Sequence, residues 1–150
     1  MKYTLEITID LPRDKVVELF LNPHNLKFWQ KGFLSHETYK GEPGQEGARA
    51  KQRHQEVKGI TESTETLTKL KLPEEIHVTY NTENVSTEQR NFFTDKDTQT
   101  TWRCETETKF SGAMKFTALM LGSEPYQKLR LQMMEDFKAF AEGKPRYGVK

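Results

Sequence analysis

The stretch TQTTWRCETETKF, residues 98–110, decides the fold because it is the clearest strand in the chain. Its even-numbered residues from Trp102 to Phe110 carry no charge, whereas its odd-numbered residues from Arg103 to Lys109 are all charged. Side chains of a strand alternate between the two faces of a sheet. One face of this strand therefore meets solvent, and the other must pack against a less polar partner.

The partner that we expect for this face is the segment that follows. Apolar residues recur there at spacings of three and four, which predicts a helix with one apolar stripe made of Tyr126, Leu129, Met133, Phe137 and Phe140. Gly143 ends this helix, and residues 144–150 are expected to form a loose tail. Between strand and helix, GAMKFTALMLGSEP (112–125) predicts one or two turns of apolar helix.

The N-terminal segment predicts a strand followed by two short helices. Residues 3–9 alternate between apolar and polar side chains, and Pro12 suits the first position of a helix. Asn22-Pro23 both ends that helix and starts a second one, which closes on the adjacent aromatics Phe28 and Trp29. We expect this second helix to pack along the rim of an internal cavity.

The centre of the chain predicts an antiparallel meander. Turn signals at GEPGQEG (41–47), Lys58-Gly59, Leu72-Pro73, 82–84 and 95–97 divide it into about six strands, at 33–41, 47–57, 60–70, 74–82, 86–94 and 98–110. The fold class is therefore α+β, with a bent antiparallel sheet of seven strands wrapped around a long C-terminal helix. Residues 1–143 form a single domain.

Composition and charge exclude several functional classes. The 150 residues carry a net charge of +1, which gives no long-range attraction for nucleic acid. No window approaches the roughly 18 consecutive apolar residues of a membrane span, and the N-terminus does not read as a signal peptide. The single cysteine, Cys104, permits no internal disulfide and suits a reducing compartment, so we expect a cytoplasmic protein. The sequence leaves open whether the chain forms a homodimer.

Four segments together resemble the START-like, or SRPBCC helix-grip, superfamily in its polyketide cyclase/dehydrase branch. They are IDLPRDKVVELFLNPHNLKFW (9–29), YKGEPGQEGARAK (39–51), residues 98–110, and SGAMKFTALMLG (111–122) leading into MMEDFKAFAEG (133–143). The resemblance implies a deep pocket between the C-terminal helix and the inner face of the sheet. It also implies a hydrophobic small-molecule ligand, with an aromatic such as Trp29 closing the second helix.

The residues expected to line that pocket follow from strand alternation. If even-numbered residues point inward in strands 47–57 and 60–70, the lining comprises Trp29, Gln52, His54, Glu62, Thr64, Tyr80, Phe93, Trp102, Cys104, Thr106, Met120, Met133 and Phe137. Ile76 and Val78 share the face of Tyr80. Such a pocket is partly apolar and partly polar, which suits an amphipathic ligand.

Two pairs of these residues suggest chemistry. A turn at Lys58-Gly59 would make His54 and Glu62 near neighbours on paired strands, and the carboxylate would orient the imidazole as a general base. The plainer interpretation is that both are surface residues on a solvated strand. Cys104 with His54 would make a nucleophile, although a lone strand cysteine is more often a small buried apolar residue. His24, His36, His54 and His77 lack the spacing of metal ligands, and we expect neither a metal nor a cofactor.

Three functions stay open from the sequence. The first is binding of a small hydrophobic or amphipathic molecule between the sheet and the C-terminal helix. The second is a cyclase/dehydrase-type enzyme that uses His54 and Glu62 as an acid-base pair. The third is a protein-interaction module, which would present an exposed apolar patch and no sizeable closed cavity.

Overall fold

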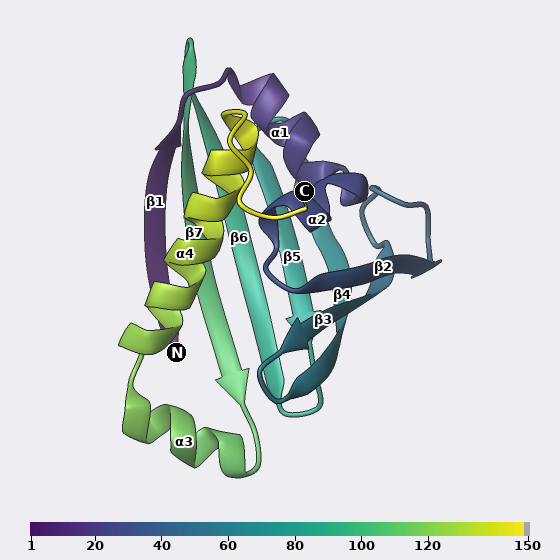
Figure 1. The fold of residues 1–150 in the computed structure, drawn as a ribbon, viewed down its shortest axis with the longest axis vertical. Helices are drawn as coiled ribbons and strands as arrows, with labels where there is room; N and C mark the ends of the chain where they lie inside the picture. Colours follow the sequence, from purple (N-terminus) through teal and green to yellow (C-terminus); the bar gives the residue numbers. More distant parts are fainter. Residues whose placement is uncertain (149–150) are drawn as a thin grey trace.

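One seven-stranded antiparallel sheet forms the frame of the molecule, with its strands in the order β1-β7-β6-β5-β4-β3-β2 (Figure 1). The structure is a computed structural model and describes residues 1–148. The strands are β1 (Lys2–Ile9), β2 (Phe33–Lys40), β3 (Arg49–Glu56), β4 (Gly59–Lys71), β5 (Glu75–Asn81), β6 (Val85–Lys96) and β7 (Gln99–Phe110). The chain runs as a meander from β2 to β7, and β1 then pairs with the last strand. The predicted fold class is confirmed.

The helices are α1 (Arg13–Leu21), the single 3-10 turn η1 (Pro23–Asn25), α2 (Leu26–Trp29), α3 (Ala113–Leu121) and α4 (Glu124–Ala141). Asn22 ends α1, and its side-chain oxygen accepts a hydrogen bond from the backbone N–H of His24 at 3.0 Å. This bond satisfies one of the free donors at the start of the next turn. In the part of the chain that the structure describes, no helix is both long enough and apolar enough to cross a membrane.

Helices α1, α2 and α4 cover the inner face of the sheet, and α4 packs against both β1 and α2 (Figure 1). Phe137 of α4 is completely buried there. Its ring centroid lies 5.6 Å from that of Phe20, 5.1 Å from Trp29 and 5.5 Å from Trp102, each in edge-to-face geometry. Because aromatic rings fill the space between α4 and the sheet at this level, the cavity expected there is replaced by packed core.

The C-terminal segment is folded onto α4 as far as the structure describes it. Asp136 of α4 is only 2% exposed and accepts hydrogen bonds from Arg146 at 2.7 Å, Tyr147 at 2.9 Å and Gln132 at 2.9 Å. The expectation of a loose tail is therefore wrong for residues 146 and 147, since a buried carboxylate holds them. The last two residues of that expected tail, 149 and 150, lie outside the described residues.

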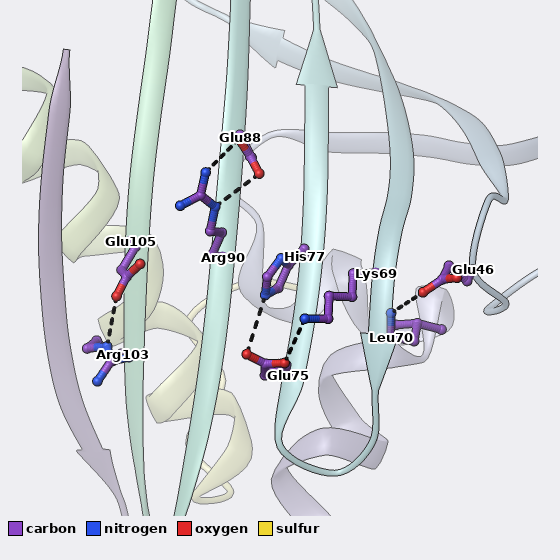
Figure 2. Close-up of polar contacts among 9 residues, drawn as sticks. All are labelled: Glu46, Lys69, Leu70, Glu75, His77, Glu88, Arg90, Arg103 and Glu105. Carbon is purple, nitrogen blue, oxygen red and sulfur yellow. Dashed lines mark hydrogen bonds and ion pairs between the residues drawn. The ribbon is translucent and has the colours of Figure 1, made fainter.

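The outer face of the sheet carries charges that pair with one another along and across strands (Figure 2). Arg90 donates to Glu88 at 3.1 Å, and Arg103 lies 3.2 Å from Glu105. On the neighbouring strands Lys69 lies 3.2 Å from Glu75, on the side where His77 also points. The residues that make these contacts alternate along their strands with residues that point inward. The solvent-facing phase predicted for residues 98–110 is therefore confirmed.

Candidate ligand-binding pocket

A pocket of about 50 Å³ lies between the sheet and the η1–α2 segment rather than beneath α4. Helical residues form one wall, namely Phe20, Leu21, Pro23, Leu26, Trp29 and Gln30. Strand residues form the other, namely His36, Thr38, Ala48, Ala50, Glu65, Leu67, Val78 and Tyr80. Pro43 and Gly44 of the 41–48 connection complete it.

Small side chains on β3 and a tight turn before it leave room for this pocket. Ala50 is 3% exposed and Ala48 only 6%, so the sheet floor carries methyl groups where larger residues would fill the space. Gly41 has φ +77°, and a Cβ added to it would lie 3.1 Å from the Cα of Ala48. Glycine is therefore required for the connection to fold back against β3.

The polar wall of the pocket is built around Glu65. Its carboxylate accepts a hydrogen bond from Gln52 Nε2 at 2.7 Å and contacts His36 Nε2 at 3.0 Å. Burial and then the neighbouring Glu65 carboxylate raise the pKa of Tyr80 well above 10, so its phenol stays protonated. Within residues 1–148 no Lys or Arg makes an ion pair with Glu65.

The register between β3 and β4 overturns the predicted His54–Glu62 pair. His54 lies opposite Thr61, and Glu62 lies opposite Arg53. The hairpin closes on Glu56 and Gly59 with Val57 and Lys58 as a two-residue turn. Such a turn sets even-numbered residues of β3 opposite odd-numbered residues of β4, so the even-numbered inner face expected for β4 is wrong. The residues of β4 that share the inner face are therefore Thr61, Ser63, Glu65 and Leu67.

Glu62 and Thr64 consequently lie on the outer face and do not contribute to the pocket. Glu62 accepts from Arg53 Nε at 2.9 Å, and Thr64 accepts from Lys51 Nζ at 3.1 Å. The phase predicted for β3 is confirmed, because Gln52 is only 2% exposed and His54 is partly buried. The error in the predicted phase was confined to β4.

His54 lies beside the pocket, held between Gln30 and Phe33. Its Nε2 is 2.8 Å from Gln30 Oε1, and its ring meets the Phe33 ring edge-on. Burial lowers the pKa of His54 despite the opposing charge of Glu56, so the imidazole is neutral near pH 7. Because the Gln30 oxygen accepts, Nε2 carries the proton.

The other predicted lining residues divide into pocket wall, packed core and surface. Trp29 and Tyr80 line the pocket. The residues Phe93, Trp102, Cys104, Thr106 and Phe137 are buried in the core, and Met133 packs against it. Met120 is 88% exposed on α3, which contradicts its predicted place in the cavity wall. Sequence reasoning placed the ligand at the centre of the sheet, where the aromatic rings meet.

Cys104 has the environment of an inert thiol. It is completely buried, and its sulfur lies 3.4 Å from Thr106 Oγ1. Burial raises its pKa, which keeps the thiol protonated. Cys104 lies opposite Asn91 on β6, whereas His54 is on β3, so the two do not form the considered nucleophilic pair.

Sequence reasoning missed His36 and Glu65 as pocket residues. The available signal was the two-residue turn at Val57–Lys58, which fixes the β4 phase, together with Leu67, an apolar residue that shares the odd-numbered face with Glu65. His36 follows from the same register, since it pairs with Gln52. Among residues 1–148, no three His, Cys, Asp or Glu side chains come together in a group able to hold a metal ion.

The comparison with protein families matches residues 1–134 to the model described as polyketide cyclase / dehydrase and lipid transport. The chain belongs to this family. The resemblance noted in the sequence is thereby confirmed over nearly the whole chain. No curated protein matches the chain.

Solved structures share this family's START-like helix-grip fold at low sequence identity. Ara h 8.0201 superposes with a TM-score of 0.76 at 14% identity, covering 95% of each chain. A conserved protein from Geobacillus kaustophilus gives 0.74 at 17% identity, covering 99% of this chain and 100% of its own. Norcoclaurine synthase from Thalictrum flavum gives 0.70 at 12% identity, covering 95% and 94%. Likeness at this level establishes the fold alone.

Proposed function

We propose that the chain binds a small amphipathic molecule in the pocket between α2 and β3–β5. The observation that carries this proposal is Glu65, a carboxylate in the wall of an otherwise largely apolar pocket. A carboxylate has about four lone-pair sites, and Gln52 and His36 occupy two of them. The remaining capacity suits a ligand that donates a hydrogen bond through a hydroxyl or amino group.

The apolar walls support a flat or aromatic ligand body. Leu67 and Val78 lie side by side on the sheet wall of the pocket, and Leu26 and Trp29 belong to its helical wall. Leu26, Leu67 and Val78 are all at most 8% exposed. Trp29 Nε1 is buried with no acceptor within the described residues, so a carbonyl or ether oxygen on the ligand would satisfy it. Apolar burial supplies affinity, and these polar groups fix orientation.

A ligand larger than a few water-sized groups needs the pocket to widen. The tip of the 41–48 connection is the element placed to allow this, because residues 42–45 are exposed. The base of the connection is held in place, since Gly47 N donates to Leu67 O at 2.7 Å and Glu46 accepts from Leu70 N at 3.0 Å. Displacement of Pro43 and Gly44 alone would open the mouth without breaking the sheet.

A second candidate function is proton transfer of the cyclase/dehydrase type, and the His36–Glu65 contact at 3.0 Å favours it. A carboxylate that orients an imidazole inside a pocket is a common general-base arrangement. This pair takes the place of His54 and Glu62 in the enzyme hypothesis. If His36 and Glu65 act as the acid-base pair, Glu65→Gln abolishes turnover and leaves substrate affinity largely intact.

The binding proposal is tested with β-naphthol and its methyl ether, which share one aromatic body and differ in the donor hydroxyl. We expect fluorescence titration to show tighter binding of the naphthol by roughly ten-fold, the value of one hydrogen bond to a charged group. Glu65→Gln should remove most of this preference. Ala50→Leu, which fills the pocket floor, should weaken both ligands.

The matched control is Gln55→Val, an outer-face change on the same strand as Ala50. It should bind both compounds as the wild type does. Equal affinity for the naphthol and its ether, or unchanged binding by a folded Ala50→Leu variant, would place the ligand elsewhere. Native mass spectrometry of freshly purified protein then identifies any molecule that co-purifies.

A further inference from the structure

Helix α3 carries an unusual concentration of exposed apolar residues. Five of the large hydrophobic side chains that face solvent belong to α3, with exposures of 38% for Met114, 71% for Phe116, 81% for Leu119, 88% for Met120 and 56% for Leu121. Ala118 is the only buried residue of this helix. In Figure 1, α3 lies at one end of the molecule, beyond the strands that α1, α2 and α4 cover.

The residues from the end of β7 through α3 are basic. From Thr108 to Ser123 the sequence contains Lys109 and Lys115 and no acidic residue. A hollow of about 670 Å³ lies between α3 and the end of β7, and Lys2, Lys109 and Lys115 all line it. Within residues 1–148 neither Lys109 nor Lys115 forms an ion pair. This local excess of positive charge is not visible in the net charge of the chain, which is only +1.

We propose that α3 docks on an anionic lipid surface. A short helix with apolar side chains around most of its circumference, flanked by lysines, enters the boundary between headgroups and acyl chains, while the lysines meet the anionic headgroups. The apolar residues supply burial, and the lysines select the charge of the surface. This proposal is independent of the pocket.

The charges argue against a second copy of the chain as the occupant. A two-fold contact places the same patch on both partners, so Lys115 and Lys109 of one copy would face those of the other without acids to offset them. A head-to-tail contact would need a free acidic surface. Four acidic residues of the outer sheet face are paired with arginines and lysines of their own strands and neighbours, namely Glu62, Glu75, Glu88 and Glu105, and the last three pairs are drawn in Figure 2.

Vesicle flotation tests the proposal with the full chain. We expect the protein to float with phosphatidylcholine vesicles that contain about one-third phosphatidylserine and to remain in solution with phosphatidylcholine alone. Binding should weaken when salt rises from about 0.1 M to about 1 M, because the Debye length falls from about 10 Å to about 3 Å. Lys109→Gln/Lys115→Gln should reduce binding to the anionic vesicles by roughly ten-fold.

The double variant Leu119→Glu/Met120→Glu should lose binding to the anionic vesicles, whereas Leu34→Glu/Ile60→Glu should keep it. The control makes the same change of charge at two exposed apolar residues on other elements, 50% and 63% exposed. Absence of wild-type binding to anionic vesicles, or equal loss in both double variants, overturns the proposal. Light scattering that shows a wild-type dimer and a Leu119→Glu/Met120→Glu monomer also overturns it, because the patch is then a self-interface.

Discussion

Glu62 and Glu65 stand on the same strand and have opposite environments. Glu62 faces solvent on the outer side of the sheet with Arg53 and Lys51, and its side chain is 44% exposed. The Glu65 side chain is 15% exposed and holds Gln52 and His36 on the inner side. The difference follows from the alternation of side chains along a strand. A shift of the strand by one residue would therefore exchange which carboxylate faces the pocket and which faces solvent.

Replacing each glutamate by glutamine separates these roles. We expect Glu62→Gln to change the free energy of unfolding by less than about 0.5 kcal/mol, because exposed ion pairs contribute little. Glu65→Gln should lower it by about 1.5–3 kcal/mol, the range for hydrogen bonds to a partly buried charged group. Urea unfolding of both variants measures the difference. A larger loss for Glu62→Gln would contradict the register between β3 and β4.

At this scale the sequence predicted one strand of the pocket correctly and its neighbour incorrectly. Ala48, Ala50 and Gln52 pointed inward as expected because small and uncharged residues share their face. On β4 both faces carry Thr, Ser and Glu, so hydrophobicity cannot distinguish them. The two-residue turn at Val57–Lys58 then decides the phase, because it sets even-numbered residues of β3 opposite odd-numbered residues of β4.

At the scale of elements, the end of α4 is held by the residues that follow it. Asp136 lies one turn before the end of the apolar stripe and is buried at 2% exposure. Its oxygens are satisfied by Arg146 and Tyr147, which reach back from beyond Gly143. A carboxylate at a buried helix position requires such partners, because an unpaired buried charge is costly.

Removal of this contact should destabilise the whole helix. A chain ending at Gly143 should lose about 2–4 kcal/mol of unfolding free energy, because Asp136 then keeps only Gln132 as a hydrogen-bond donor. Asp136→Asn in the shortened chain should recover part of this loss, since the amide carries no charge. Thermal and urea unfolding of the three chains checks the result. Equal stability of the full and shortened chains would mean that Arg146 and Tyr147 contribute nothing.

Element positions were predicted well, and their packing was not. The strand predicted at 98–110 is β7 at 99–110, and the helix predicted to stop at Gly143 ends at Ala141. Period and turn signals fix such boundaries locally. The filling of the space beneath α4 depends on Phe20, Trp29 and Trp102 meeting Phe137 from three different elements. Phe93 of a fourth element packs against Phe20 and Trp102, and no local pattern reveals these contacts.

At the scale of the whole molecule, two histidines link stability to pH. Burial lowers the pKa of His54 and of His77 below the ordinary value of 6.5. The unfolded chain therefore binds more protons than the folded chain just below pH 6.5. Stability from these groups is fully present above 6.5 and is lost as pH falls toward their folded values. A hydrogen bond from Lys69 lowers the pKa of Glu75 from 4.5. The contribution of Glu75 to the free energy of unfolding is therefore lost at a more acidic pH than that of the histidines.

We expect the free energy of unfolding to fall between pH 7 and pH 5.5 and His54→Gln to reduce this slope. The glutamine side chain can still reach Gln30, so the contact is retained while the titrating group is removed. His24→Gln, on the exposed η1 turn, is the control and should leave the slope unchanged. Urea unfolding at four or five pH values gives the slopes. A flat wild-type profile in this range would contradict the burial of both imidazoles.

The pairing of β1 with β7 sets the order in which the molecule is completed during synthesis. Lys2 lies opposite Glu107, so the first strand of this sheet to be synthesised pairs with the last strand of the sheet. At about 5–20 residues per second, β1 waits roughly 5–20 s for that partner. The hairpins from β2 to β6 are complete by then, because each joins neighbours in the chain. The half-apolar strand β1 therefore has no partner strand until β7 is made, and chaperones that bind extended apolar segments have access to it during that time.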